Sequence, residues 1–324
     1  MIDAGRITFL TPAAGLVALV GLVPLMMLYS VSDHARGVRA ALRLREPADR
    51  RLVIAGTVGA VAVLVGLAAA QPVLARTDEQ RVRADAEAIF VFDTSRSMLA
   101  SVGPSGLTRL DRAKNDALRL RAALPEVPVG IASMTDRTLP HLFPLADEVA
   151  FRSTVEQTIS VEQPPPMAYF STVGTTFAAL AALQSRGFFA PSSRHRLLVV
   201  FTDGESRPFD EVALGTVLRR SPGIKPVFVH VWNRKERLYA NGVAEPGYRP
   251  NPRSGAELDR VARATGGASF AEGRPGAVAD VLRHSLGTGP SLTETRSQKE
   301  FALGPFLIAL AGLPLLFVLI RLSR

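Results

Sequence analysis

The chain has no cysteine and few aromatic residues. Its 324 residues include no Cys, a single Trp and 6% aromatic residues overall. The absence of cysteine excludes disulfide bonds, thiolate catalysis and zinc–thiolate sites. No Gly-x4-Gly-Lys-Ser/Thr motif is present, so an ATP site of the P-loop type is excluded too. The five histidines show no i,i+4 pairing, and each is interpreted as a structural or surface residue rather than a metal ligand.

Charged residues are absent from three long stretches of the chain. About 20 apolar residues in a helix span the ~30 Å hydrocarbon layer of a membrane. A buried core helix is the alternative for each stretch, and a signal peptide is a further alternative for the first. We expect three transmembrane helices, over Phe9–Tyr29, Val53–Leu74 and Phe301–Ile320, because 7–32, 52–75 and 301–320 contain no Asp, Glu, Lys or Arg.

The distribution of arginine predicts the topology. The net charge is +9, but residues 77–300 contain no dense Lys/Arg run, so no nucleic-acid partner is expected. The loop between the first two apolar stretches holds six arginines against three acidic residues, which places it in the cytoplasm by the positive-inside rule. We therefore predict two transmembrane helices with a basic cytoplasmic loop (1–76), an extracytoplasmic domain (77–300), and a C-terminal transmembrane helix with a short cytoplasmic tail (301–324).

Apolar strands alternate with helical patterns in the predicted domain. Ile89–Phe92 and Leu197–Phe201 are short runs rich in β-branched and aromatic residues, typical of buried parallel strands. Between them, Thr108 and Asp111 form a capping-box start for an amphipathic helix. Thr138–Leu145 is a candidate for an antiparallel edge strand. This alternation predicts an α/β fold with a doubly wound, mostly parallel sheet.

Acidic and hydroxyl side chains follow the predicted strands. Asp93, Ser95 and Ser97 come directly after the first buried strand, and Asp203 follows the second. Thr175 lies in a loop that leads into a helical pattern. Ligands of parallel sheets gather at the carboxyl ends of strands, and aspartate and hydroxyl oxygens suit Mg²⁺, or Mn²⁺ or Ca²⁺. The three segments together predict a metal site on one edge of the sheet.

The order and spacing of these motifs resemble the von Willebrand factor A (VWA) family over roughly residues 86–286. That family has a Rossmann-like fold and a metal-ion-dependent adhesion site (MIDAS) built from Asp-x-Ser-x-Ser, a threonine loop and a later aspartate. The resemblance implies that Ser95, Ser97 and Thr175 offer hydroxyls to the metal, while Asp93 and Asp203 act mostly through bound water. Arg96 departs from the family pattern, which often has a small residue there, and it would lower metal affinity unless its side chain points away.

A divalent cation held by hydroxyls and water keeps most of its positive charge. It can therefore accept a carboxylate from another molecule as its last ligand, and we expect a protein-interaction module with an acidic partner. Catalysis would need a positioned base or nucleophile near the metal, and none is evident in the motifs, so an enzyme is not expected. Two alternatives remain: a metal-independent structural membrane anchor, and a metal-dependent hydrolase.

The whole architecture resembles the bacterial Bat-type (aerotolerance-associated) VWA membrane proteins. This resemblance implies a multi-pass protein of the cell (inner) membrane that works within a multi-protein envelope complex. The partners that it implies are a second VWA membrane protein and a cytoplasmic MoxR-type AAA+ ATPase.

The longest segment without a clear pattern in the predicted domain is Asn233–Ser254. It leaves the sheet at the same edge as the metal motifs, because it follows a predicted strand that ends at Trp232. Two interpretations stay open: a solvated surface loop, or a rim of the metal site that contacts a partner through Tyr239 or Tyr248. Similarly, Gln163–Pro166 is either a stiff connector or a recognition surface.

Overall fold

The chain forms two compact units in the computed structural model. The first, here called the helical unit, consists of Met1–Glu79 and Thr295–Arg324, and the second, the α/β unit, of Gln80–Glu294. The predicted connector Gln163–Pro166 lies outside the described residues. The structure describes residues 6–42, 51–162 and 175–322.

The helical unit holds two helical regions long and apolar enough to cross a membrane among its described residues, Pro12–Val31 and Leu52–Ala69. The third predicted span is also a helix, but its described apolar part covers only Gly304–Phe317. Two helical regions of membrane length are therefore found among the described residues, and the third transmembrane helix stays a prediction. The helices are η1 (a 3-10 helix, Pro12–Gly21), α1 (Leu22–Ala41), α2 (Arg51–Ala69) and α9 (Gly304–Leu322).

The second apolar helix ends earlier than the sequence predicted, at Ala69 instead of Leu74. Gln71 has a positive φ of 50°, and Pro72 lacks the backbone N–H that a continuing helix needs. The chain instead enters a three-stranded sheet that the sequence analysis did not predict, in which β1 pairs antiparallel with β2 and β2 neighbours β11. The strands are β1 (Arg6–Phe9), β2 (Pro72–Arg83) and β11 (Ser291–Ala302).

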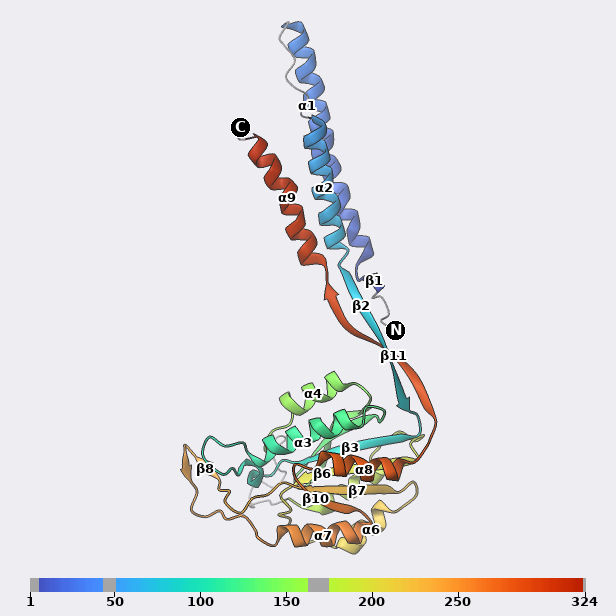
Figure 1. Cartoon of the computed structure of the whole chain (residues 1–324), viewed down its shortest axis with the longest axis vertical. Helices are drawn as coiled ribbons and strands as arrows, with labels where there is room; N and C mark the ends of the chain where they lie inside the picture. Colours follow the sequence, from blue (N-terminus) through green and yellow to red (C-terminus); the bar gives the residue numbers. More distant parts are fainter. Residues whose placement is uncertain (1–5, 43–50, 163–174, 323–324) are drawn as a thin grey trace. The chain divides into compact units, whose positions relative to one another are not determined.

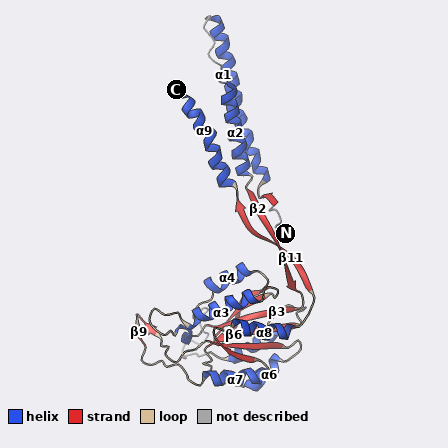
Figure 2. Ribbon diagram, viewed as in Figure 1, coloured by secondary structure: helices blue, strands red, loops and turns tan. Residues whose placement is uncertain are grey.

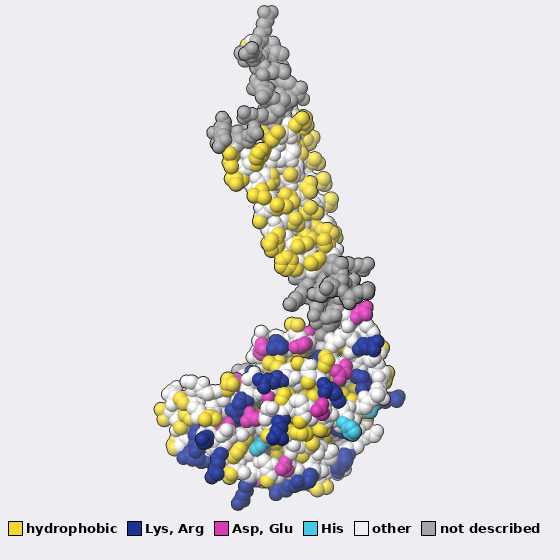
Figure 3. Space-filling view, viewed as in Figure 1, with side chains coloured by type: hydrophobic (Ala, Val, Ile, Leu, Met, Phe, Trp, Pro, Cys, Tyr) yellow, Lys and Arg dark blue, Asp and Glu magenta, His cyan; other side chains and the backbone are white. Residues whose placement is uncertain are grey.

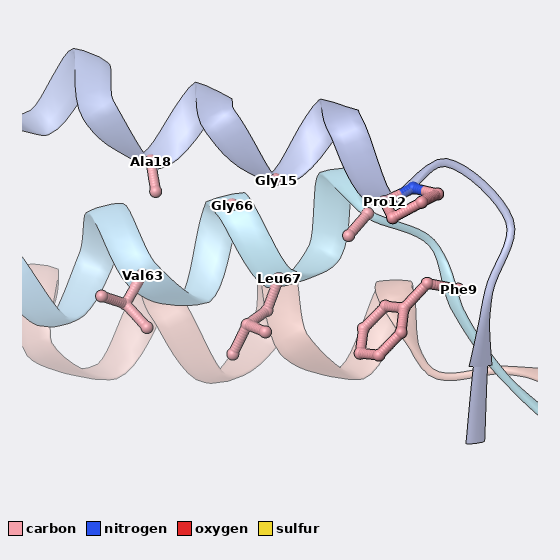
Figure 4. Close-up of a pocket in the computed structure, with 8 residues that line it drawn as sticks. Phe9, Pro12, Gly15, Ala18, Val63, Gly66 and Leu67 are labelled. Atoms are coloured by element: carbon pink, nitrogen blue, oxygen red, sulfur yellow. The ribbon is translucent and has the colours of Figure 1, made fainter. Parts of the chain in front are cut away.

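Small residues allow η1 to pack closely against α2. Figure 4 shows Gly15 and Ala18 of η1 lying over Gly66 of α2. A Cβ atom added to Gly66 would lie 2.6 Å from the Cβ of Ala18 and 2.9 Å from the carbonyl oxygen of Gly15. Such close approach of backbones is typical of helix pairs in an apolar environment, where van der Waals packing drives association.

A six-stranded sheet forms the centre of the α/β unit (Figure 1, Figure 2). Its strand order is β10-β7-β6-β3-β4-β5, and all neighbours are parallel except β5, which pairs antiparallel with β4 at the edge. The predicted mostly parallel α/β sheet and its antiparallel edge strand are thus confirmed. The strands are β3 (Ala86–Asp93), β4 (Val129–Met134), β5 (Thr138–Leu145), β6 (His195–Thr202), β7 (Ile224–His230) and β10 (Ala268–Ala271).

Helices cover both faces of this sheet because its central strands are buried on both sides. In β3, Phe90 and Phe92 pack with α3, α4 and α8, while Ile89 and Val91 face the core shared with η3, α6 and α7. The predicted capping box of α3 is present, with Thr108 and Asp111 bonded reciprocally. The helices are α3 (Arg109–Ala123), α4 (Glu148–Gln157), η3 (Phe177–Ala181), α5 (Ala182–Ser185), α6 (Glu211–Leu218), α7 (Ser254–Thr265) and α8 (Pro275–Leu286).

Candidate metal site

Asp93 is the central acceptor of the predicted site. It ends β3, and its side chain is fully buried. Its Oδ1 accepts hydrogen bonds from the backbone N–H of Ser95 and from the Thr175 hydroxyl, both at 2.9 Å. Its Oδ2 accepts from the Thr202 hydroxyl at 2.8 Å. One carboxylate therefore ties together the ends of β3 and β6 and the threonine loop.

Ser95 and Ser97 lie on the turn that follows β3, where η2 (Arg96–Leu99) begins. Their hydroxyl oxygens are 3.0 Å apart. Adjacent ligands of an octahedral ion at about 2.1 Å from the metal are about 3 Å apart. The two hydroxyls thus have the separation that neighbouring Mg²⁺ ligands require.

Asp203 lies beyond the end of β6 and is fully buried. Its Oδ1 accepts from the backbone N–H of Glu205 at 2.9 Å, and its Oδ2 accepts from the Arg109 guanidinium at 2.6 Å. The threonine loop is held beside it, because the Arg207 N–H donates to the carbonyl oxygen of Thr175 at 2.8 Å. The structure thus brings the predicted residues to one edge of the sheet, with Asp203 engaged by protein donors on both oxygens.

Sequence reasoning did not identify Arg109, although it is the buried cation of this region. Its guanidinium is fully buried and donates to Asp203, to Glu236 at 2.7 Å and to the Tyr248 hydroxyl at 2.7 Å. The Tyr248 hydroxyl in turn donates to Glu205 at 3.1 Å. Arg109 is the first residue of α3, and no local motif marks it, because its partners come from segments distant in the sequence.

The segment Asn233–Ser254 is not a free surface loop. It contains a short hairpin of β8 (Tyr239–Ala240) and β9 (Val243–Ala244). Its turn residues Asn241 and Gly242 have φ values of 49° and 80°, as a type I′ hairpin turn requires. The Asn-Gly pair was a signal in the sequence that would have predicted this hairpin.

Arg96, the departure from the family pattern, contacts this same segment. Its guanidinium lies 2.5 Å from a carboxylate oxygen of Glu245. The side chain of Arg96 is 60% exposed and points to an acidic partner at the surface. Its positive charge is therefore offset by Glu245.

Burial and neighbouring charge raise the pKa of Asp93 to about 7. The main cause is the loss of water around the carboxylate, and the negative charge of Asp203 adds to it. In the described part of the chain, Asp93 has no ion-pair partner, and no group of three or more His, Cys, Asp or Glu could hold a metal. A cation at this site would therefore depend on the hydroxyl ligands, and it would supply the positive charge that Asp93 lacks.

We expect divalent cations to raise the thermal stability of the protein more at about pH 8 than at about pH 5.5. Because the folded-state pKa of Asp93 is raised, its contribution to stability is fully present below its ordinary value of 3.8 and is lost as the pH rises through about 7. A bound cation compensates for this loss at high pH, whereas at low pH it must displace a proton. Melting curves with and without Mg²⁺ at both pH values measure the difference, and an equal shift at both would contradict the prediction.

Comparisons with known proteins identify structural neighbours only. No family model matches the chain, and no curated protein matches it. The α/β structure is similar to an aerotolerance-related membrane protein from Bacteroides fragilis (21% identity, 62% of this chain and 98% of that chain, TM-score 0.48). It is also similar to BatB from Bacteroides thetaiotaomicron (21% identity, 62% and 97%, TM-score 0.49). A third neighbour is proximal thread matrix protein 1 of the mussel byssus, with a zinc-occupied MIDAS motif (12% identity, 79% and 55%, TM-score 0.41).

Proposed function

We propose that the α/β unit is a protein-interaction module that binds a carboxylate of a partner protein through a divalent metal. Ser95, Ser97 and Thr175 would hold the ion through their hydroxyls, and Asp93 and Asp203 would act through bound water. Mg²⁺ is the proposed ion, with Mn²⁺ or Ca²⁺ as substitutes. The observation that carries the proposal is the buried carboxylate of Asp93, which has no ion-pair partner among the described residues, beside the paired serine hydroxyls.

The chemistry of this donor set favours binding. Neutral hydroxyl ligands leave the ion with most of its charge, so it attracts an acidic side chain from outside. The histidine packed beside Asp203 has its Nε2 3.0 Å from the backbone carbonyl oxygen of Asp203, which can only accept a hydrogen bond. The Nε2 of His230 therefore carries a proton and is not poised as a general base.

The proposed setting is the bacterial inner membrane. Three transmembrane helices, in the divisions 1–76, 77–300 and 301–324, would place the α/β unit outside the cytoplasm, since the basic loop between α1 and α2 is cytoplasmic by the positive-inside rule. The resemblance of the whole architecture to the Bat-type proteins extends this to a complex with a second VWA membrane protein and a MoxR-type ATPase. A metal-independent structural anchor is the competing proposal.

The Thr175 hydroxyl provides the sharpest test of metal binding. Thr175→Val keeps the shape of this buried side chain but removes its oxygen, whereas Thr175→Ser keeps the oxygen. We expect the valine variant to bind Mn²⁺ at least about tenfold more weakly than the wild type, and the serine variant to bind within a few-fold of it. Calorimetric titration of the full chain in detergent measures both, and a peptide with one glutamate should bind only when the metal is present.

Circular dichroism of both variants controls for folding. Equal Mn²⁺ affinity in the wild type and in a folded valine variant would contradict the assignment of Thr175 as a ligand. Peptide binding that does not depend on the metal would favour the structural-anchor proposal instead.

A further inference from the structure

The segment 233–253 is fixed against the metal-site edge by contacts on both sides of its hairpin. At its start, the buried carboxylate of Glu236 accepts hydrogen bonds from Arg109 and Arg112. The backbone of Arg237 then pairs with Ser101, which follows the serine turn, with N···O distances of 3.0 and 2.9 Å. The hairpin that follows is therefore held at the edge where the serine hydroxyls lie.

The second half of the segment is held by the neighbours of Asp203. Tyr248 bonds to both Arg109 and Glu205, and the backbone N–H of Asn251 donates to Glu205 at 3.0 Å. The same Arg109 nitrogen that contacts Tyr248 also contacts Asp203. Only one guanidinium nitrogen thus separates this segment from a residue of the metal site, so the segment adjoins that site.

The charge that this segment presents to solvent is positive. Its two carboxylates are both engaged, Glu236 by Arg109 and Arg112 and Glu245 by Arg96. Its cations make no ion pair in the part of the chain that the structure describes. Figure 3 shows Lys and Arg side chains spread over the visible face of the α/β unit, with some of them near the end where Figure 1 places β8. The cations, here called the basic rim, are Arg234, Lys235, Arg237, Arg249 and Arg253.

We propose that the basic rim binds further acidic residues of the partner whose carboxylate enters the metal site. The partner is then an acidic protein segment with several Asp or Glu residues, not a surface with one exposed acid. This inference rests on the proposed function, because the metal site supplies the first contact. Charge complementarity around a metal-bound carboxylate would add affinity at low ionic strength and accelerate association.

An anionic membrane surface is the other class of occupant for a basic patch. The geometry favours the acidic protein segment, because the rim and the metal-site hydroxyls share one edge of the sheet and the hydroxyl site suits a metal-bound carboxylate. A lipid surface would have no need of Ser95, Ser97 or Thr175.

The test compares two fourfold variants of the full chain in neutral-lipid nanodiscs. The rim variant replaces Arg234, Lys235, Arg249 and Arg253, all exposed, by glutamine. The control variant makes the same change at Arg186, Arg194, Arg220 and Lys225, which are also exposed and lie near the amino-terminal ends of β6 and β7 or on the turns that precede them. The probes are Mn²⁺ alone, a peptide with one glutamate, a peptide of the same length with four glutamates, and vesicles that contain phosphatidylglycerol.

We expect the rim variant to bind the four-glutamate peptide at least about tenfold more weakly at low salt, with the difference lost at about 0.5 M salt. Its affinity for Mn²⁺ and for the one-glutamate peptide should change less than about twofold, and the control variant should match the wild type. An unchanged affinity of the rim variant for the four-glutamate peptide overturns the proposal, as does an equal loss in the control variant. The proposal is also overturned, in favour of a lipid surface, if the wild type binds the vesicles, the rim variant does not, and the wild type does not bind the four-glutamate peptide. If the wild type itself does not bind Mn²⁺, the metal site is refuted instead.

Discussion

Replacement of Asp93 by asparagine is expected to weaken Mg²⁺ and Mn²⁺ binding about 100-fold or more. The substitution removes the negative charge at the centre of the site, while asparagine keeps nearly the same shape and can still accept hydrogen bonds from Ser95 and Thr175. At about pH 8 the removal of this buried negative charge should offset the lost acceptor of the Thr202 hydroxyl, so we expect the metal-free fold to keep its stability. Calorimetric titration of the full chain in detergent measures the affinity, and thermal unfolding measures the stability.

A matched control is Asp280→Asn, since Asp280 is an exposed aspartate on α8 that forms an i,i+3 ion pair with Arg283. We expect this variant to bind metal like the wild type. Unchanged metal affinity in Asp93→Asn would show that Asp93 does not contribute to metal binding. The absence of binding in the wild type, with a partner carboxylate supplied, would leave the structural-anchor proposal ahead.

Replacement of Arg109 by methionine is expected to destabilise the α/β unit by about 3–5 kcal/mol. The side chain is fully buried and neutralises Asp203 and Glu236, which are themselves fully buried. Methionine fills much of the same volume but leaves both carboxylates without this partner. Chemical unfolding followed by the fluorescence of Trp232, the single tryptophan of the chain, reports on this region, since Trp232 stacks on His230.

Two further variants separate the charge effect from packing. Arg119→Met changes an exposed arginine on the same helix and should alter stability by less than about 0.5 kcal/mol. Adding Asp203→Asn to Arg109→Met removes the buried charge that the first substitution leaves without its cation and should restore part of the lost stability, whereas Glu236 keeps its ion pair with Arg112. If Arg109→Met lowers the free energy of unfolding by less than about 1 kcal/mol, other groups compensate the charges of Asp203 and Glu236.

Local patterns in the sequence predicted the sheet and the positions of the site residues. The run Leu197–Phe201 is apolar at every position, and such a run predicts a central parallel strand covered on both faces. The structure shows this strand, with all five residues buried. Polar residues at the ends of such strands must meet at one edge, so Asp93 and Asp203 could be placed together without a structure. The capping box at Thr108 was equally local, since its hydrogen bonds span only three residues.

The early end of α2 and the three-stranded sheet of β1, β2 and β11 were missed for a physical reason. Apolar composition continues from Val53 to Leu74, and hydropathy does not distinguish a helix from the strand that begins at Pro72. The pairing of β2 with β1 and β11 joins segments far apart in the chain, which no local pattern records.

The sequence by itself determined the alternation of strands and helices, the long apolar stretches, and the edge of the sheet where the Asp and hydroxyl side chains meet. These follow from local preference and from periodic burial, which short segments encode. Only the tertiary structure decided that Arg109 neutralises Asp203 and that the segment 233–253 folds back onto the site with its cations facing solvent. Those features depend on contacts between residues about 90 to 140 positions apart, such as Arg109 with Asp203 and with Tyr248. Contacts at that separation form only when the packed sheet brings the segments together.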